Sequence, residues 1–210
     1  MKYLVMCEGP NELEIIRILL EHDKLIFRND DLLNLVPYHA RQIATSGAVK
    51  AALNLYIGEI CVLRIGDKLG EALKIPPQYK DRIVEVRKYC TKPELEMLLI
   101  ITEGLDDAFE KVKSKRSPKA FSKEHIQYGR KRYDNSTAFF RTYYGDRVDE
   151  LTGTIRRYKQ IKGKHQKDEL YLADLLRYSK IYRYRRILTI PCPQTSCIQM
   201  GHLFHNGHLF

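Results

Sequence analysis

The sequence predicts an α/β fold: a small, mainly parallel β-sheet flanked by helices and followed by a basic helical half. Three observations predict it. Short apolar runs, such as 2–7 and 61–67, alternate with segments whose apolar residues recur at helical spacing. An acidic residue stands at the end of both runs, where parallel sheets bind ligands. The 210 residues, 44% of them hydrophobic, suffice for one such domain with a helical extension.

The first half of the chain should alternate strands and helices. We expect four strands, at residues 2–7, 32–38, 61–67 and 83–89. Pro37 should end the second of them. One helix begins at Pro10 and Asn11, and another, at 46–56, is opened by Ser46 and Gly47. This alternation favours a parallel sheet covered on both faces.

Helical patterns dominate after Pro93, which is placed to begin a helix. Further helices are expected at about 105–114, 118–128, 135–144, 146–161 and 168–180. We therefore divide the chain into an α/β core at 1–105, a basic helical extension packed on it at 106–190, and a disordered tail at 191–210.

Composition excludes several classes of protein. No apolar run approaches the roughly 20 residues that a membrane helix needs, and 97–102 is the strongest. The N-terminus reads directly into a strand without the features of a signal peptide, so we expect a cytoplasmic protein. Of the five cysteines, Cys7 and Cys61 fall within apolar strands, and we expect no disulfide framework.

A formal net charge of +10 favours a polyanionic partner, most simply DNA or RNA. Basic residues concentrate at 111–133 and 156–186, with tyrosines between them. The alternative is a solvated basic face that binds nothing. For the charges we favour nucleic acid, and for the tyrosines we favour helix packing over base stacking. The expected phosphate contacts are Lys115, Arg116, Arg130, Lys131, Arg132, Lys159, Lys162, Lys164 and Lys167.

Carboxylates gather at the predicted edge of the sheet. Glu8 and Asp67 follow strands, and Glu94 and Glu96 open a later helix. Acids brought to one edge repel one another unless a cation neutralises them, and their hard oxygen atoms suit Mg²⁺ or Mn²⁺. Each acid alone also has an ordinary explanation as a helix-start or turn residue. Their joint occurrence in a basic protein favours the metal site.

The segment LVMCEGPNELEIIRILL, residues 4–20, resembles the first motif of Toprim domains, especially those of OLD-type and other defence-associated nucleases. That motif is a strand, Glu-Gly, a small or polar pair, Glu and a helix, so Glu8, Gly9 and Glu12 match it. The segment KPELEMLLI is similar to a Pro-x-x-Glu-x-Leu-Leu stretch of small Toprim-like proteins, which makes Glu96 the matched acid. The resemblance covers about residues 2–105.

The second Toprim motif, Asp-x-Asp, is incomplete. The segment VLRIGDKLG supplies Asp67, but Leu69 stands where the second aspartate is expected. This departure removes one expected metal ligand. Glu71, one helical turn beyond Asp67, is the candidate that partly replaces it.

The resemblance implies a metal-dependent phosphodiesterase, a nuclease acting on DNA or RNA in bacterial antiviral defence. Glu8 and Asp67 would be the catalytic residues and would bind Mg²⁺ or Mn²⁺ with Glu12 and Glu96. Toprim domains also occur in primases and topoisomerases, but a topoisomerase needs a further domain with a nucleophilic tyrosine. We also expect a larger protein complex or a homo-oligomer.

Two other functions stay open from the sequence. One is a catalytically inactive Toprim-like subunit that binds nucleic acid or a partner in a larger defence complex, which the missing aspartate supports. The other is a purely structural subunit. Zinc ligand types occur in the tail, but their loose spacing and the repeated GHLF lead us to expect no zinc there. The tail residues of zinc-ligand type are Cys192, Cys197, His202, His205 and His208.

Overall fold

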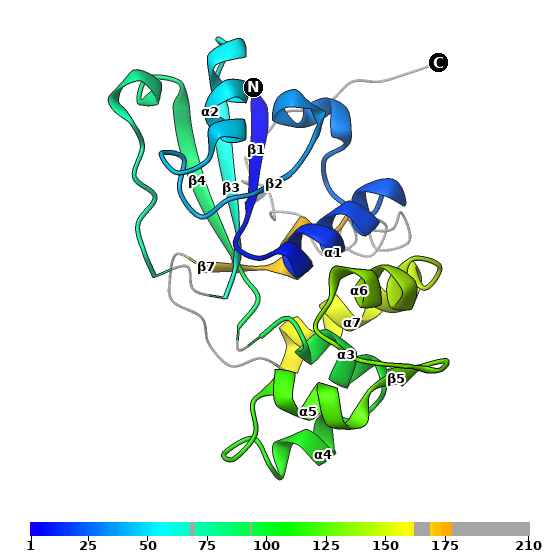
Figure 1. Cartoon of the computed structure of the whole chain (residues 1–210). Coiled ribbons are helices and arrows are strands. Elements are labelled where there is room, and N and C mark those ends of the chain that lie inside the picture. Colours follow the sequence, from blue (N-terminus) through cyan, green and yellow to red (C-terminus); the bar gives the residue numbers. More distant parts are fainter. Residues whose placement is uncertain (68–69, 93, 162–168, 178–210) are drawn as a thin grey trace, which may run out of the picture. The chain divides into compact units, whose positions relative to one another are not determined.

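A parallel β-sheet lies at the centre of the computed structural model, which describes residues 1–67, 70–92, 94–161 and 169–177 (Figure 1). Within these residues the sheet has five strands in the order β2-β1-β3-β4-β7. The strands are β1 (Lys2–Cys7), β2 (Tyr38–His39), β3 (Ile60–Gly66), β4 (Ile83–Cys90) and β7 (Glu169–Tyr171). The predicted α/β class and three of the four predicted strands are therefore confirmed.

The register of the two central strands fixes where the site can form. β1 and β3 are direct neighbours, with Lys2 paired to Ile60 and Cys7 paired to Ile65. Because they are parallel and in step, their carboxyl ends reach the same edge of the sheet at the same level.

The helices begin where local chemistry favours a start. Pro10 is the first residue of α1, and serine hydroxyl groups cap three later helices by accepting hydrogen bonds from backbone N–H groups. The capping residues are Ser46, Ser117 and Ser136. The helices are α1 (Pro10–Glu21), α2 (Gly47–Leu55), α3 (Met97–Thr102), α4 (Asp106–Glu110), α5 (Pro118–His125), α6 (Thr137–Tyr144) and α7 (Val148–Ile161).

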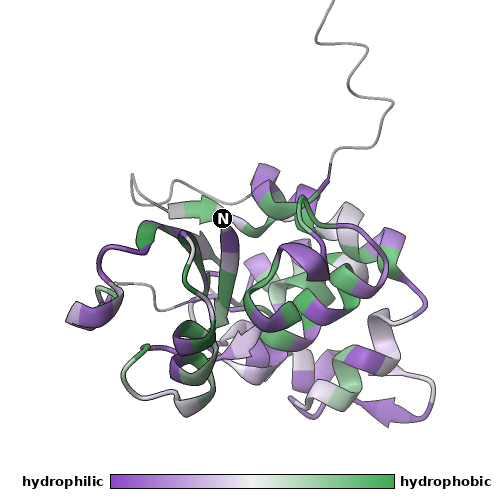
Figure 2. Ribbon diagram, turned by 90° about the horizontal axis from the view of Figure 1, so that it is seen from above, coloured by the Kyte–Doolittle hydropathy of each residue, from purple (hydrophilic) through white to green (hydrophobic). Residues whose placement is uncertain are grey.

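Two apolar clusters cover the two faces of the sheet. The smaller one packs α2 on one face, against alternate residues of β1 and β3 such as Leu4 and Val62. The larger one lies on the other face, where it includes α1, and it continues into the helices of the second half. Figure 2 shows apolar residues along the central strands and on the inner sides of the helices.

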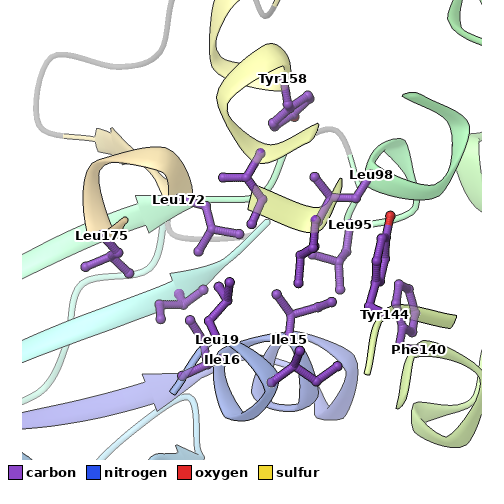
Figure 3. Close-up of a cluster of buried hydrophobic side chains, with 14 of the residues drawn as sticks. Ile15, Ile16, Leu19, Leu95, Leu98, Phe140, Tyr144, Tyr158, Leu172 and Leu175 are labelled. Carbon is purple, nitrogen blue, oxygen red and sulfur yellow. The ribbon is translucent and has the colours of Figure 1, made fainter. Parts of the chain in front are cut away.

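The larger cluster joins the two halves of the chain into one core. Side chains from α1 meet side chains from the α3 region, α6, α7 and the segment after β7 (Figure 3). Examples are Ile15 and Leu19 on α1, Leu98 on α3, and Phe140 and Tyr144 on α6, all buried. The second half therefore shares one apolar core with α1 and the sheet.

The predicted strand at 32–38 is wrong. The chain forms two 3₁₀ turns, Asn29–Asp31 and Leu33–Leu35; Leu32 makes a single isolated bridge to Tyr3 of β1, and only Tyr38 and His39 form a strand beside β1. Asn34 and Leu35 have φ angles of 54° and 63°, in the left-handed region, which an extended strand cannot contain. The strand thus begins after Pro37 rather than ending there.

The predicted helix at 168–180 is also wrong within the described residues 169–177. Its first part is β7, which pairs with Lys88–Cys90 of β4, and its next part is a 3₁₀ turn at Leu172–Leu175. The predicted helix at 118–128 ends earlier, at His125. A hairpin of β5 (Gln127–Tyr128) and β6 (Lys131–Arg132) follows it.

The described residues through Arg177 belong to one compact unit. The division at residue 105 remains a prediction, and the predicted tail at 191–210 lies outside the described residues. None of the described helices is both long enough and apolar enough to cross a bilayer.

The shared core predicts a contrast between two leucines on helices. Leu19 on α1 is fully buried, whereas Leu55 at the end of α2 is 84% exposed. We expect Leu19→Ala to lower the free energy of unfolding by about 2–5 kcal/mol and Leu55→Ala to change it by less than about 0.5 kcal/mol. Urea unfolding followed by circular dichroism measures both, and equal losses would contradict this description of the core.

Candidate functional site

Glu8 extends β1 by one residue at the carboxyl edge of the sheet. Its backbone N–H donates to the carbonyl oxygen of Ile65 at 2.8 Å, which continues the pairing of β1 with β3. Its side chain lies against Gly66. A Cβ atom added to Gly66 would lie 2.5 Å from both the Cβ and Oε2 atoms of Glu8. Gly66 therefore leaves the space in which the Glu8 carboxylate is held, nearly buried, at the end of the neighbouring strand.

Glu12 lies in the first turn of α1, and its carboxylate folds back over Gly9. Burial, the largest cause, and the nearby carboxylates of Asp67, Glu96 and Glu8 together raise the pKa of Glu12 to about 7. The four acids that the sequence singled out thus share one electrostatic neighbourhood, although they come from three separate parts of the chain.

Glu96 completes this acidic cluster, which we define as Glu8, Glu12, Asp67 and Glu96. The residue is 3% exposed and directly precedes α3. The hydroxyl group of Tyr133 donates a hydrogen bond of 2.6 Å to its Oε1 atom, and Lys119 Nζ lies 3.8 Å from the same oxygen. The second half of the chain therefore holds the last acid of the cluster in place.

Glu94 has a different role from the cluster. Its Oε2 atom accepts a hydrogen bond from the backbone N–H of Lys119 at 2.8 Å, in the first turn of α5. A carboxylate at that position satisfies a helix-start donor and interacts favourably with the helix dipole. For Glu94 the structural explanation is sufficient.

A polar link joins the start of α1 to the loop before α6. Asn11 Nδ2 donates to Asn135 Oδ1 at 3.2 Å, and Tyr133 contacts the same oxygen at 3.2 Å. Asn135 has a φ of 63°, a conformation that asparagine adopts more readily than most residues. This link runs from the residue beside Glu12 to the residue that holds Glu96.

Three basic residues that the sequence did not single out surround Glu8. Arg41 Nε lies 3.4 Å from Glu8 Oε1, and His39 Nε2 lies 3.2 Å from the carbonyl oxygen of Glu8. Arg64, on β3, is buried and donates to the carbonyl oxygen of Glu71 at 2.6 Å. Burial lowers the pKa of Arg64, whereas the negative charge of Glu8 acts to raise it. A charged residue inside an apolar strand was the available sequence signal for Arg64.

The donor chemistry of the acidic cluster fits a hard divalent cation, because its members are carboxylates whose mutual repulsion a cation relieves. In the described ranges, however, no three Asp, Glu, His or Cys side chains converge closely enough to hold a metal ion. Leu69 lies outside the described residues. Glu71 contributes its backbone to Arg64, and the metal ligands predicted from the sequence remain a prediction.

The predicted phosphate contacts divide into two groups. Lys115, Arg130 and Arg132 are exposed and form no ion pair with any described residue. The others pair internally: Arg116 with Glu124 at 2.6 Å, Lys131 with Asp134 at 3.2 Å, and Lys159 with Asp174. Lys162, Lys164 and Lys167 lie outside the described residues, as do the five Cys and His residues of the tail.

Most of the interleaved tyrosines that the structure describes pack in the core, as predicted. Tyr133, Tyr143, Tyr144 and Tyr158 are all buried. Tyr128, on the hairpin, is 39% exposed and packs edge-on against Tyr143, with Arg147 over both rings. The helix-packing interpretation is therefore confirmed for the four buried tyrosines.

No protein-family model matches the chain, and neither a curated protein nor a solved structure matches it.

The raised pKa of Glu12 predicts a pH-dependent stability. In the folded protein Glu12 holds its proton up to about pH 7, whereas its ordinary pKa is 4.5. The folded state therefore binds more protons between these values, and its stability falls as the pH rises through this window, by at most about 3 kcal/mol. Glu12→Gln should match the wild type at pH 5 and exceed it in stability at pH 8.

Urea unfolding in EDTA at both pH values measures the effect. Glu59→Gln, at an exposed glutamate beside the opposite edge of the sheet, should keep the pH dependence of the wild type. An equal stability difference between Glu12→Gln and the wild type at pH 5 and pH 8 would show that Glu12 does not carry the predicted proton.

Proposed function

We propose that the protein is a metal-dependent phosphodiesterase that cleaves DNA or RNA. The observation that carries the proposal is the acidic cluster at the carboxyl edge of a parallel sheet, where burial and the neighbouring acids together raise the pKa of Glu12 to about 7. The resemblance of residues 4–20 to the first Toprim motif supports the same function. On that resemblance, the setting would be bacterial antiviral defence, within a larger complex or a homo-oligomer.

Glu8 and Asp67 would be the principal residues of the site, with Glu12 and Glu96 as supporting ligands of Mg²⁺ or Mn²⁺. When bound, such a cation supplies positive charge at the scissile phosphate and lowers the pKa of a bound water. The protein's own part is to hold the carboxylates: Gly66 gives room to Glu8, and Tyr133 orients Glu96. Arg41 keeps the Glu8 side chain at the edge.

The basic hairpin β5–β6 is the candidate contact for the substrate. Arg130 and Arg132 are exposed there and are not neutralised within the described part of the chain. Tyr133, which directly follows Arg132, donates to Glu96 in the acidic cluster. A phosphate chain bound at the hairpin would therefore lie close to the carboxylates.

The second candidate is a catalytically inactive subunit that binds nucleic acid or a partner protein. Two observations favour it: Leu69 replaces the second aspartate of the Toprim motif, and no three potential ligands converge among the described residues. It predicts salt-sensitive binding of nucleic acid without cleavage.

Substitution of the two principal acids separates these candidates. With Mg²⁺ or Mn²⁺, Glu8→Gln and Asp67→Asn should each lower the cleavage of plasmid DNA or of a structured RNA by at least about a hundredfold. Asp81→Asn removes an exposed aspartate from the opposite edge of the sheet, before β4, and should stay within about twofold of the wild type. Absence of metal-dependent cleavage by the wild type above the level of Glu8→Gln would reject the enzyme.

The two groups of basic residues should differ in nucleic-acid binding. We expect the double variant Arg130→Ala, Arg132→Ala to bind a labelled oligonucleotide about tenfold more weakly and to lower the salt dependence by about two charges. The matched double variant Arg116→Ala, Lys159→Ala removes the same charge, but from residues that already pair with Glu124 and Asp174. It should lose clearly less affinity by fluorescence anisotropy, and equal losses would argue against the hairpin.

A further inference from the structure

A hollow of about 620 Å³ opens beside Glu8, on the face of the sheet that α2 covers. Its polar lining comes from Glu8, His39, Arg41, Thr45 and Ser46. None of these residues except Glu8 belongs to the acidic cluster or to the basic residues predicted from the sequence. The hollow is therefore a separate feature that adjoins the candidate site.

Arg41 presents hydrogen-bond donors beyond those that it uses. Its Nε atom lies 3.4 Å from the Oε1 atom of Glu8 and 3.4 Å from the backbone carbonyl oxygen of the same residue. A guanidinium group carries four further N–H donors on its two Nη atoms, and these form no hydrogen bond with any described residue. The side chain is 66% exposed, so Arg41 can hold Glu8 with one edge and bind a second anion with the other.

Ser46 adds a second kind of donor to the hollow. Its Oγ atom accepts from the backbone N–H of Val49, which leaves its O–H free to donate. His39 donates from Nε2 to the carbonyl oxygen of Glu8, so Nδ1 of the neutral ring is an acceptor, and the O–H of Thr45 donates to the carbonyl oxygen of Gln42. The donors of the Arg41 guanidinium and the Ser46 hydroxyl group match a phosphate, which offers acceptor oxygens.

A second arginine lies behind the hollow. Arg64 lines an adjoining cavity with Glu8, Arg41 and Glu71, and it is only 5% exposed. Glu8 is the one carboxylate among the residues that line the main hollow, and Arg41 partly neutralises it. Across the two cavities, Arg41 and Arg64 therefore offset the charges of Glu8 and Glu71.

We propose that this hollow binds a phosphate group of a nucleic-acid strand, next to the phosphate that faces the acidic cluster, with Arg41 as the principal contact. The identity of the ligand as nucleic acid rests on the proposed function. The strand would then contact the protein on both sides of the carboxylates, at Arg41 and at the β5–β6 hairpin.

The test compares two matched arginines in the full-length protein with EDTA present. Arg28, like Arg41, has a 66% exposed side chain that engages an acid through Nε, in its case Asp23 at 3.0 Å. By anisotropy with a fluorescein-labelled single-stranded 12-mer, Arg41→Ala should weaken binding about fivefold to tenfold, and Arg28→Ala less than about twofold. Arg41→Lys should recover only part of the loss, because lysine lacks the fork of donors.

Inorganic phosphate and a nucleoside monophosphate serve as separate probes by ¹H–¹⁵N NMR. A shift of the Ser46 amide signal that is lost in Arg41→Ala supports the proposal when the oligonucleotide affinity falls as well. Shifts without any fall in oligonucleotide affinity overturn it in favour of a free anion. Equal affinities of Arg41→Ala, Arg28→Ala and the wild type overturn it outright. Because these measurements need no cleavage, a failure of the nuclease proposal would remain distinguishable.

Discussion

Two neighbouring parallel strands that end at the same level bring the residues after them to one edge of the sheet. In this protein those residues are Glu8, after β1, and Asp67, after β3. Like charges near a partly buried edge repel one another strongly, because less water screens them there than at an open surface. Much of the surrounding structure can be understood as a response to this constraint. Gly66 makes room for Glu8, Arg41 compensates its charge, and Glu12 holds its proton up to about pH 7.

The second half of the chain contributes to the same edge. Tyr133 and Lys119 contact Glu96, and Asn135 binds the side chain of Asn11 at the start of α1. Farther along α1, Arg141 of α6 pairs with Glu14 and Glu21. These contacts fasten the helices to the element that carries Glu12. The basic hairpin is thereby tied to the acidic cluster, which gives a physical reason for treating the two as one site.

The sequence pattern predicted those elements that depend on residues close together in the chain. The strands β1, β3 and β4, the start of α1 at Pro10 and the positions of Glu8 and Asp67 all follow from short apolar runs and their ends. The segment 169–177 looked helical because its leucines recur at helical spacing, but pairing with β4, remote in sequence, makes part of it a strand. The left-handed backbone conformation of Asn34 and Leu35 could likewise not be predicted from the pattern of apolar residues.

The candidate site was predictable only in part for the same reason. The acids were found because each stands at the end or start of an element, whereas His39 and Arg41 gain meaning only from their distance to Glu8. Counting basic residues also overstated the free charge. Arg116, Lys131 and Lys159 pair with acids of their own half, which no composition can show.

The central claim is that the acidic cluster binds a divalent cation. Its most direct test is the titration of the Glu12 carboxyl group by ¹³C NMR, in protein labelled at glutamate side chains and assigned with Glu12→Gln. In EDTA the pKa should be about 7. With millimolar Mg²⁺ it should fall toward the ordinary value of 4.5, because the bound cation stabilises the ionised form. A Glu12 titration that is the same in EDTA and in Mg²⁺ would contradict the claim.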